Sequence, residues 1–328
     1  MSTQLDLQPL YTFAAIISFV AGGMIGSFLN VCVYRLPRKE SIVKPRSHCP
    51  KCGKLIAWYD NVPILSWVLL RGKCRHCEQS ISRVYPLVEA ITATLFLFVF
   101  WRFGFTFATP VYMALSAALV LVTFVDLTDW TIPNEVTLPG IPIGLGLAVV
   151  AMVWPGSNLV LAHTGSMPAV FDALLGTAIG GASLYMLDKV SLLLLGKRGM
   201  GFGDVKLLAM LGAFLGWKNV LLIIMISSCL GSVVGVAAIV IERLLRKRNQ
   251  GAGAQMPQTA QGVEAPAKSS KQDEQQAEPE HVPVAGHYLP FGPYLAAAGL
   301  IVIFFGEAIF DAYYNFITAG NAPADLPF

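Results

Sequence analysis

Charged side chains are scarce in this chain. Only 13% of its 328 residues are Asp, Glu, Lys or Arg, whereas 55% are hydrophobic. A soluble domain carries about 25% charged residues, so this composition excludes an ordinary soluble enzyme. Several apolar runs reach the roughly 20 residues that a helix needs to cross a bilayer. We therefore predict an all-α polytopic membrane protein that contacts membrane lipid.

The ten residues before the first apolar run contain no Lys or Arg. Because a signal peptide begins with a basic region, we expect the run 11–34 to be a retained first transmembrane helix. The chain also shows no convincing internal repeat, which many transporters have. It lacks the pattern of a soluble α/β nucleotide-binding fold. Separately, we expect no nucleic-acid partner.

Positive charge is concentrated in the polar segment 35–85, which holds eleven Lys or Arg residues and three acids. Cytoplasmic loops of membrane proteins are enriched in Lys and Arg, so we place this segment in the cytoplasm. The run 205–216 is short for a crossing. It must nevertheless cross if the basic residues Arg243, Arg246, Lys247 and Arg248 are to stay on the cytoplasmic side. We therefore predict about eight transmembrane helices.

The remaining boundaries follow from composition. After the first helix 11–34 and the loop 35–85, a membrane core is expected over 86–248, with helices at 86–100, 111–125, 136–154, 170–195, 205–216 and 220–241. The segment 249–286 is rich in Gln, Ala, Pro and charge. Such a segment cannot bury enough apolar surface to fold, so we interpret it as a disordered cytoplasmic linker. A last transmembrane helix at 287–310 and a tail at 311–328 complete the chain.

Four of the six cysteines form two C-x-x-C pairs within the polar loop. They are Cys49 with Cys52 and Cys74 with Cys77, and twenty-one residues separate the pairs. Two such pairs at this spacing are typical of a four-thiolate zinc site. A closed site of this kind stabilises a fold and leaves no position for a substrate. A redox role and disulfides are the alternatives, and disulfides would require an oxidising compartment.

Two acids occupy similar positions at the ends of apolar runs. Asp126 ends one run shortly before Ile132-Pro133-Asn134, and Asp204 follows Gly201-Phe202-Gly203 just before another. An ionisable residue at the edge of a membrane helix is costly, so a functional role is the first hypothesis. Two carboxylates held close together cannot both ionise easily, so such a pair shares a proton. The ionised member can then take a proton from water while the other donates one to a carbonyl oxygen.

Each of these acids could instead have a purely structural role. Asp204 precedes an apolar helix and would serve as an N-cap. Asp126 could simply mark the interfacial end of a helix, and Asp129 lies three residues further on.

The motifs resemble those of the bacterial type IV prepilin leader peptidases, which are membrane aspartic proteases of the G-x-G-D type. The family pattern places an Asp six residues before the Leu or Ile of a Leu/Ile-Pro pair, which Asp126 satisfies and Asp129 does not. The resemblance extends over most of the chain, through the segments 26–37, 60–74, 81–89 and 290–293.

This resemblance implies catalytic roles for Asp126 and Asp204. It implies cleavage of the leader from type IV prepilins or type II secretion pseudopilins at the cytoplasmic face of the inner membrane. It also implies N-methylation of the new N-terminus with S-adenosyl-L-methionine, an activity in which the family's cysteine loop takes part. The spacing itself gives no sign of this second activity. Three alternatives remain: a peptidase without methyl transfer, an ion- or proton-coupled transporter, and a zinc-containing scaffold without chemistry.

Overall fold

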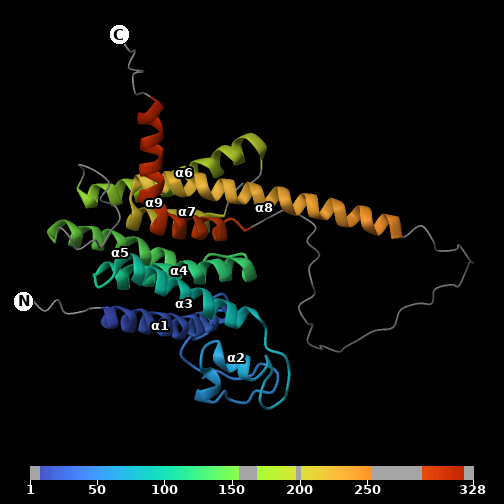
Figure 1. Ribbon diagram of the computed structural model, residues 1–328. Coiled ribbons are helices and arrows are strands. Elements are labelled where there is room, and N and C mark those ends of the chain that lie inside the picture. The colour runs from blue at the N-terminus through green and yellow to red at the C-terminus, as the bar shows by residue number, and fades with distance from the viewer. Residues whose placement is uncertain (1–7, 155–167, 197–200, 253–289, 321–328) are drawn as a thin grey trace, which may run out of the picture. The chain divides into compact units, whose positions relative to one another are not determined.

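The computed structural model describes residues 8–154, 168–196, 201–252 and 290–320. Within these ranges the regular structure is helical, apart from two isolated β-bridges. Eight long or medium helices carry the fold (Figure 1), and two short ones lie in the loop after the first. The long and medium helices are α1 (Gln8–Arg35), α3 (Val84–Phe103), α4 (Ala108–Asp129), α5 (Asn134–Val153), α6 (Ala169–Leu195), α7 (Phe202–Leu215), α8 (Trp217–Ala252) and α9 (Gly292–Gly320). The short ones are η1 (Trp58–Asn61) and α2 (Leu65–Leu69).

Seven of the described helices are long and apolar enough to cross a membrane. The predicted all-α membrane fold is therefore confirmed. Helix α7 is the exception, because its 14 residues are too few for an ordinary crossing. Its side chains are almost all buried, and it packs against α5, α6 and α9. Its role as an eighth crossing stays a prediction.

Several helix ends differ from the expected positions. Helix α9 starts at Gly292 and continues past Phe310 to Gly320, so the beginning of the predicted tail is helical. Helix α8 continues past Arg248 to Ala252, so the first residues of the predicted linker are helical too. The rest of that linker lies outside the described residues, as do the connections 155–167 and 197–200.

The described chain divides into two units. The first comprises the chain up to Ser228 together with the segment from Pro290 onward. It contains the polar loop and both acids of interest. The second begins at Cys229 and includes the rest of α8.

Glycine allows α1 and α3 to approach closely. A Cβ on Gly22 would lie 2.7 Å from the Ala93 Cα, and one on Gly26 would lie 2.7 Å from the Glu89 Cα. Gly22 and Gly26 are four residues apart and lie on one face of the helix. Small residues at this spacing let membrane helices pack backbone to backbone.

The same arrangement surrounds α7. On α6, a Cβ on Gly176 would lie 2.4 Å from the Gly212 carbonyl oxygen, and one on Gly180 would lie 2.6 Å from the Leu208 carbonyl oxygen. On α5, a Cβ on Gly140 would meet Met210 at 2.3 Å. Helix α7 is therefore held between two glycine-bearing faces, and this fixes the position of the acid in its first turn.

Candidate active site and metal centre

Asp126 lies in the last turn of α4, where the helix is stopped abruptly. Trp130 takes a left-handed conformation with φ of 55°, and its N–H donates to the Asp126 carbonyl oxygen at 3.1 Å. The chain then runs to Pro133, which precedes the first turn of α5 with φ of −65° and ψ of 126°. Asp126 is buried, with 6% of its surface exposed.

Asp204 lies in the first turn of α7, and its burial is similar at 7%. Gly201 caps this helix with φ of −73° and ψ of 140°, without a side-chain cap. Asp204 is therefore not the N-cap. Its N–H donates to the Gly201 carbonyl oxygen at 3.2 Å, and the Gly201 amide is a donor to its carboxylate. An acidic side chain reaching back to the cap amide is a known way to close a helix start.

One carboxylate oxygen of Asp204 makes no hydrogen bond within the described chain that would stabilise the start of the helix. Its Oδ1 atom is buried and has no hydrogen-bond partner among the described residues. Buried polar atoms are nearly always paired, so such an exception requires an explanation. Asp204 also interacts electrostatically with Asp126. The structure thus brings together two acids that are 78 positions apart in the sequence.

Ile132 and two glycines let the segments of the site pack closely together. A Cβ on Gly203 would lie 2.8 Å from the Ile132 Cβ. A Cβ on Gly292 would lie 2.5 Å from the Asp126 Oδ2 and 3.1 Å from the Ile132 Cδ1. The Gly292 amide is also a hydrogen-bond donor to the Asp126 carboxylate. The start of α9 therefore belongs to the site, although the sequence pattern assigned no role to Gly292.

A polar contact joins the two acid-bearing segments at their solvent side. The Lys206 ammonium donates to the Asn134 side-chain oxygen, and it lies 5.1 Å from the centre of the Phe202 ring. Asn134 belongs to the Ile132-Pro133-Asn134 motif and Lys206 follows Asp204 of the G-x-G-D motif by two residues, but their contact was not foreseen. Asp129 lies beyond Asp126 on the last turn and accepts a hydrogen bond from Thr128 at 2.9 Å.

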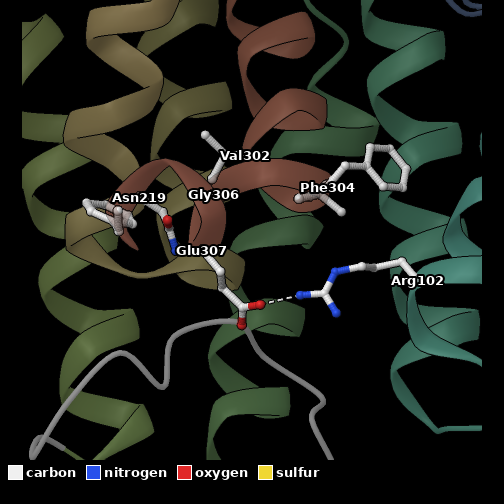
Figure 2. A pocket seen from close by; sticks show the side chains of 8 residues that line it. Arg102, Asn219, Val302, Phe304, Gly306 and Glu307 are labelled. Carbon is white, nitrogen blue, oxygen red and sulfur yellow. Dashed lines mark hydrogen bonds and ion pairs between the residues drawn. The ribbon is translucent and has the colours of Figure 1, made fainter. Parts of the chain in front are cut away.

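A hollow adjoins this corner. It is lined by residues at the end of α1, by Val125 of α4 and by the connection to α5, namely Leu36, Pro37, Val125, Thr131, Ile132, Pro133, Asn134 and Glu135. A second pocket lies at the opposite end of α3 and α9, away from the acids. Figure 2 shows the Arg102 guanidinium pointing toward the Glu307 carboxylate there, with which it forms an ion pair.

The four loop cysteines come together as predicted. Their sulfur atoms all lie within 4.8 Å of one another, and this group could hold a metal ion. All six cysteines of the chain are free thiols in the structure, so the disulfide alternative is not supported. The backbone amides of Cys77 and His76 lower the pKa of the Cys74 thiol to about 7. The Gln79 backbone hydrogen bond lowers the pKa of the Cys77 thiol, but burial and the neighbouring thiols outweigh it and raise this pKa to about 11. A lowered pKa favours the thiolate, which is the form that binds metal.

The two C-x-x-C turns have the same backbone design. In the first, the Cys49 N–H donates to the Lys54 carbonyl and the Gly53 N–H donates to the Cys49 carbonyl. In the second, Cys74, Gln79 and Glu78 make the equivalent bonds. Gly53 and Glu78 are matching positions, and both have left-handed φ values, 67° and 56°. The repeated turn explains why the four sulfurs converge.

Ionic and aromatic contacts attach these turns to the rest of the loop. Arg75 binds Asp60 through two hydrogen bonds, of 2.7 and 2.5 Å. The hydrogen bond from Arg75 lowers the pKa of the Asp60 carboxyl below its ordinary value. The Trp67 indole N–H donates to the Ile81 carbonyl at 3.2 Å. We call residues 46–83, which contain both turns and these contacts, the metal module.

Comparisons with known proteins agree with this geometry. A family model described as "Bacterial Peptidase A24 N-terminal domain" matches residues 20–103. A second model, described as "Type IV leader peptidase family", matches residues 113–236. A protein of Myxococcus xanthus named prepilin leader peptidase/N-methyltransferase is 36% identical over 89% of this chain and 90% of its own length. The chain belongs to the type IV leader peptidase family.

Other members of the family are similarly close. A protein of the same name from Pseudomonas aeruginosa is 32% identical over 91% of this chain and 93% of its own. One from Neisseria gonorrhoeae is 35% identical over 74% of this chain and 87% of its own. No solved structure matches the chain. The first matched region covers the second half of α1, the metal module and α3, and the second covers the segments with Asp126 and Asp204.

Proposed function

We propose that this protein is a membrane aspartic endopeptidase that removes the leader of type IV prepilins or type II secretion pseudopilins. Family membership and the names of its relatives support this assignment. The observation that carries it is the buried pair of Asp126 and Asp204, together with the unpaired Oδ1 of Asp204. An acid held without a partner beside a second acid is suited to bind a reacting water or carbonyl group.

The chemistry requires one proton shared by the pair. The ionised carboxylate takes a proton from water as the water oxygen attacks the scissile carbonyl carbon. The protonated carboxyl donates its proton to the carbonyl oxygen, which gives a tetrahedral diol. When the C–N bond breaks, a proton moves to the departing amine and the carbonyl re-forms as a carboxylic acid. The pair acts as a unit, so neither role is assigned to one residue.

The surroundings of the pair suit an extended peptide. The hollow beside Asp126 includes Val125 and the connection 131–135, so residues next to the scissile bond have a place to lie. The substrate's own apolar helix would lie in the bilayer against the helices of the enzyme. The basic loop 35–85 supports a cytoplasmic location for this end of the bundle, because cytoplasmic loops are enriched in Lys and Arg. We therefore propose an inner-membrane protein with its site at the cytoplasmic face.

Zinc fits the four cysteines. A Zn–S bond of about 2.3 Å places two sulfurs of a tetrahedral site about 3.8 Å apart. The Cys49 and Cys77 sulfurs are 3.8 Å apart. Four thiolates complete the coordination, so Cys49, Cys52, Cys74 and Cys77 would hold zinc as a structural ion. The ion would fix the fold of the metal module and would take no part in peptide cleavage.

The second activity is methylation of the amine that cleavage exposes, with S-adenosyl-L-methionine supplying the methyl group. The relatives' names include N-methyltransferase, and this supports the proposal. The matched region that holds the metal module is distinct from the one that holds both acids. We therefore expect the two activities to separate by substitution.

The test uses purified protein in proteoliposomes, a cognate prepilin and S-adenosyl-L-methionine, with the N-terminal peptide mass as readout. We expect the wild type to remove the leader and add about one methyl mass. Asp126→Asn and Asp204→Asn should leave the substrate uncut, and Asp129→Asn is the matched control that should cut it. An already cut pilin given to Asp204→Asn should still be methylated. A folded wild type that leaves a cognate prepilin intact would refute the proposal.

A further inference from the structure

The basic loop contains one stretch that does not resemble a soluble loop. Residues 62–70 read Val-Pro-Ile-Leu-Ser-Trp-Val-Leu-Leu, without a charged side chain. The short helix α2 lies within this stretch. Nine residues are far fewer than the roughly 20 that a helix needs to cross a bilayer. If this stretch enters the membrane, it must leave on the same side.

Two contacts place this stretch alongside the transmembrane helices. Pro63 packs on α1, where a Cβ on Gly23 would lie 3.4 Å from the Pro63 Cβ. Gly23 is twelve residues before Arg35, the last residue of α1, which corresponds to about 18 Å along the helix. On α3, the Glu89 carboxylate accepts a hydrogen bond from the Ile64 N–H at 2.6 Å.

The position of Glu89 gives the smaller estimate of depth. Glu89 is five residues after Val84, the first residue of α3, which corresponds to about 7 to 8 Å along the helix. Helix α3 has 20 residues and therefore spans about 30 Å, the thickness of the hydrocarbon core. Both estimates place Pro63 and Ile64 beside membrane-spanning parts of α1 and α3.

The outer face of α2 is apolar and uncovered. Leu65, Val68 and Leu69 are 54%, 57% and 72% exposed. They follow the i, i+3, i+4 spacing of one helix face. Ile64 and Trp67 are half-buried and face the protein. At the depth given by Pro63 and Ile64, the medium that meets the exposed face is the hydrocarbon of the bilayer.

The backbone of the stretch suits a medium without water, in which polar groups must be paired within the protein. The Ser66 N–H donates to the Val62 carbonyl at 3.1 Å, and the Val68 N–H donates to the Ile64 carbonyl at 3.1 Å. Ile64 has a left-handed φ of 62°, and its N–H is the one that Glu89 accepts. Glu89 is itself buried, at 8% exposure, and Ser27 of α1 is a second donor to it.

We propose that residues 62–70 form a re-entrant segment that dips into the bilayer from the side on which the two C-x-x-C turns lie. Leu65, Val68 and Leu69 contact lipid acyl chains, and Glu89 receives the backbone N–H at the turn. The segment anchors the two C-x-x-C turns at the membrane surface. Asp60 lies just before the segment, and its ion pair with Arg75 connects the segment to the second C-x-x-C turn. This inference rests on the membrane fold and not on the proposed peptidase activity.

The test measures depth with a fluorescent amino acid, Anap, incorporated at single positions of the full-length protein in liposomes. Quenching by brominated lipids reports contact with acyl chains, and quenching by iodide reports contact with water. The probe replaces Leu69 in the segment, Met24 on the lipid-facing side of α1, or Leu55 in the first C-x-x-C turn. The last two are matched controls, since they are 62% and 57% exposed.

We expect the probe at Leu69 to be quenched by brominated lipid like that at Met24 and to be protected from iodide, while Leu55 shows the reverse. Iodide quenching at Leu69 equal to that at Leu55, in protein that keeps its helix content, would overturn the proposal. A second arm tests Glu89 with the probe kept at Leu69. Glu89→Leu should raise iodide quenching several-fold, and Glu89→Gln, which retains an acceptor, should not. Unchanged quenching in Glu89→Leu would refute the role given to Glu89.

Discussion

A methyl group added at Gly292 should disable the enzyme although neither acid is substituted. The Cβ of an alanine there would lie 2.5 Å from the Asp126 Oδ2 and 3.1 Å from the Ile132 Cδ1. An ordinary contact begins at 3.4 Å, so the carboxylate must move by about 0.9 Å. A displacement of about 1 Å at a reacting group can cost about 100-fold in rate. We therefore expect Gly292→Ala to lower kcat about 100-fold.

The matched control is Gly146→Ala. Gly146 lies in α5, and a Cβ there would meet nothing within 4 Å. Leader cleavage is measured with a prepilin in proteoliposomes, together with thermal unfolding in detergent. The substrate does not rest on Gly292 in this account, so KM should change little in the Gly292 variant. Activity within twofold of the wild type for Gly292→Ala, in protein of normal stability, would show that the start of α9 does not position Asp126.

Three further predictions concern other parts of the molecule. Lys206→Met should lower kcat about tenfold, because it removes one hydrogen bond made by a charged group. Adding Asn134→Ala to this variant should cause little further loss. Cys74→Ser should lower the zinc content measured by mass spectrometry, and methyl transfer should fall more than leader cleavage. Gly22→Ala should destabilise the protein by about 1 to 3 kcal/mol through overpacking against α3, as measured by thermal unfolding. Gly23→Ala is its control, because a Cβ there makes an ordinary contact of 3.4 Å.

Each of these predictions has an outcome that contradicts it. Additive losses in Lys206→Met and Asn134→Ala would show that their contact does not position the acids. Equal losses of both activities in Cys74→Ser would mean that the metal module supports the whole fold. An unchanged unfolding temperature in Gly22→Ala would show that α1 and α3 can separate at low cost.

The membrane fold could be predicted because hydrophobicity and length suffice for it. The apolar runs specified the long helices, and charge alone located the polar loop. Helix α7 was harder, since its 14 residues are too short for the length argument. Its position depends on close contact with Gly140, Gly176 and Gly180, and such contacts are not visible in a hydropathy pattern. The ends of α8 and α9 were missed for a similar reason, because helices can extend beyond their apolar parts.

The two halves of the site differed in how far the sequence could specify them. Two C-x-x-C pairs define the cysteine cluster almost completely, because each turn presents its two sulfurs locally. The acid pair depends on tertiary structure. The sequence singled out Asp126 and Asp204 but could not show that Gly292 lies against Asp126, or that Asp204 is not a helix cap. The Ile64 contact with Glu89 was equally hidden, since it links a loop to a helix 25 positions away.

If Asp126 and Asp204 act as one catalytic unit, single-turnover cleavage of a prepilin by variants of the two acids will show it. The rate constant is measured for the wild type, Asp126→Asn, Asp204→Asn and the double variant. Residues that act as a unit give strongly non-additive losses. We expect each single variant to lose nearly as much activity as the double variant. Substantial cleavage by either single variant, or losses that multiply in the double variant, would contradict it.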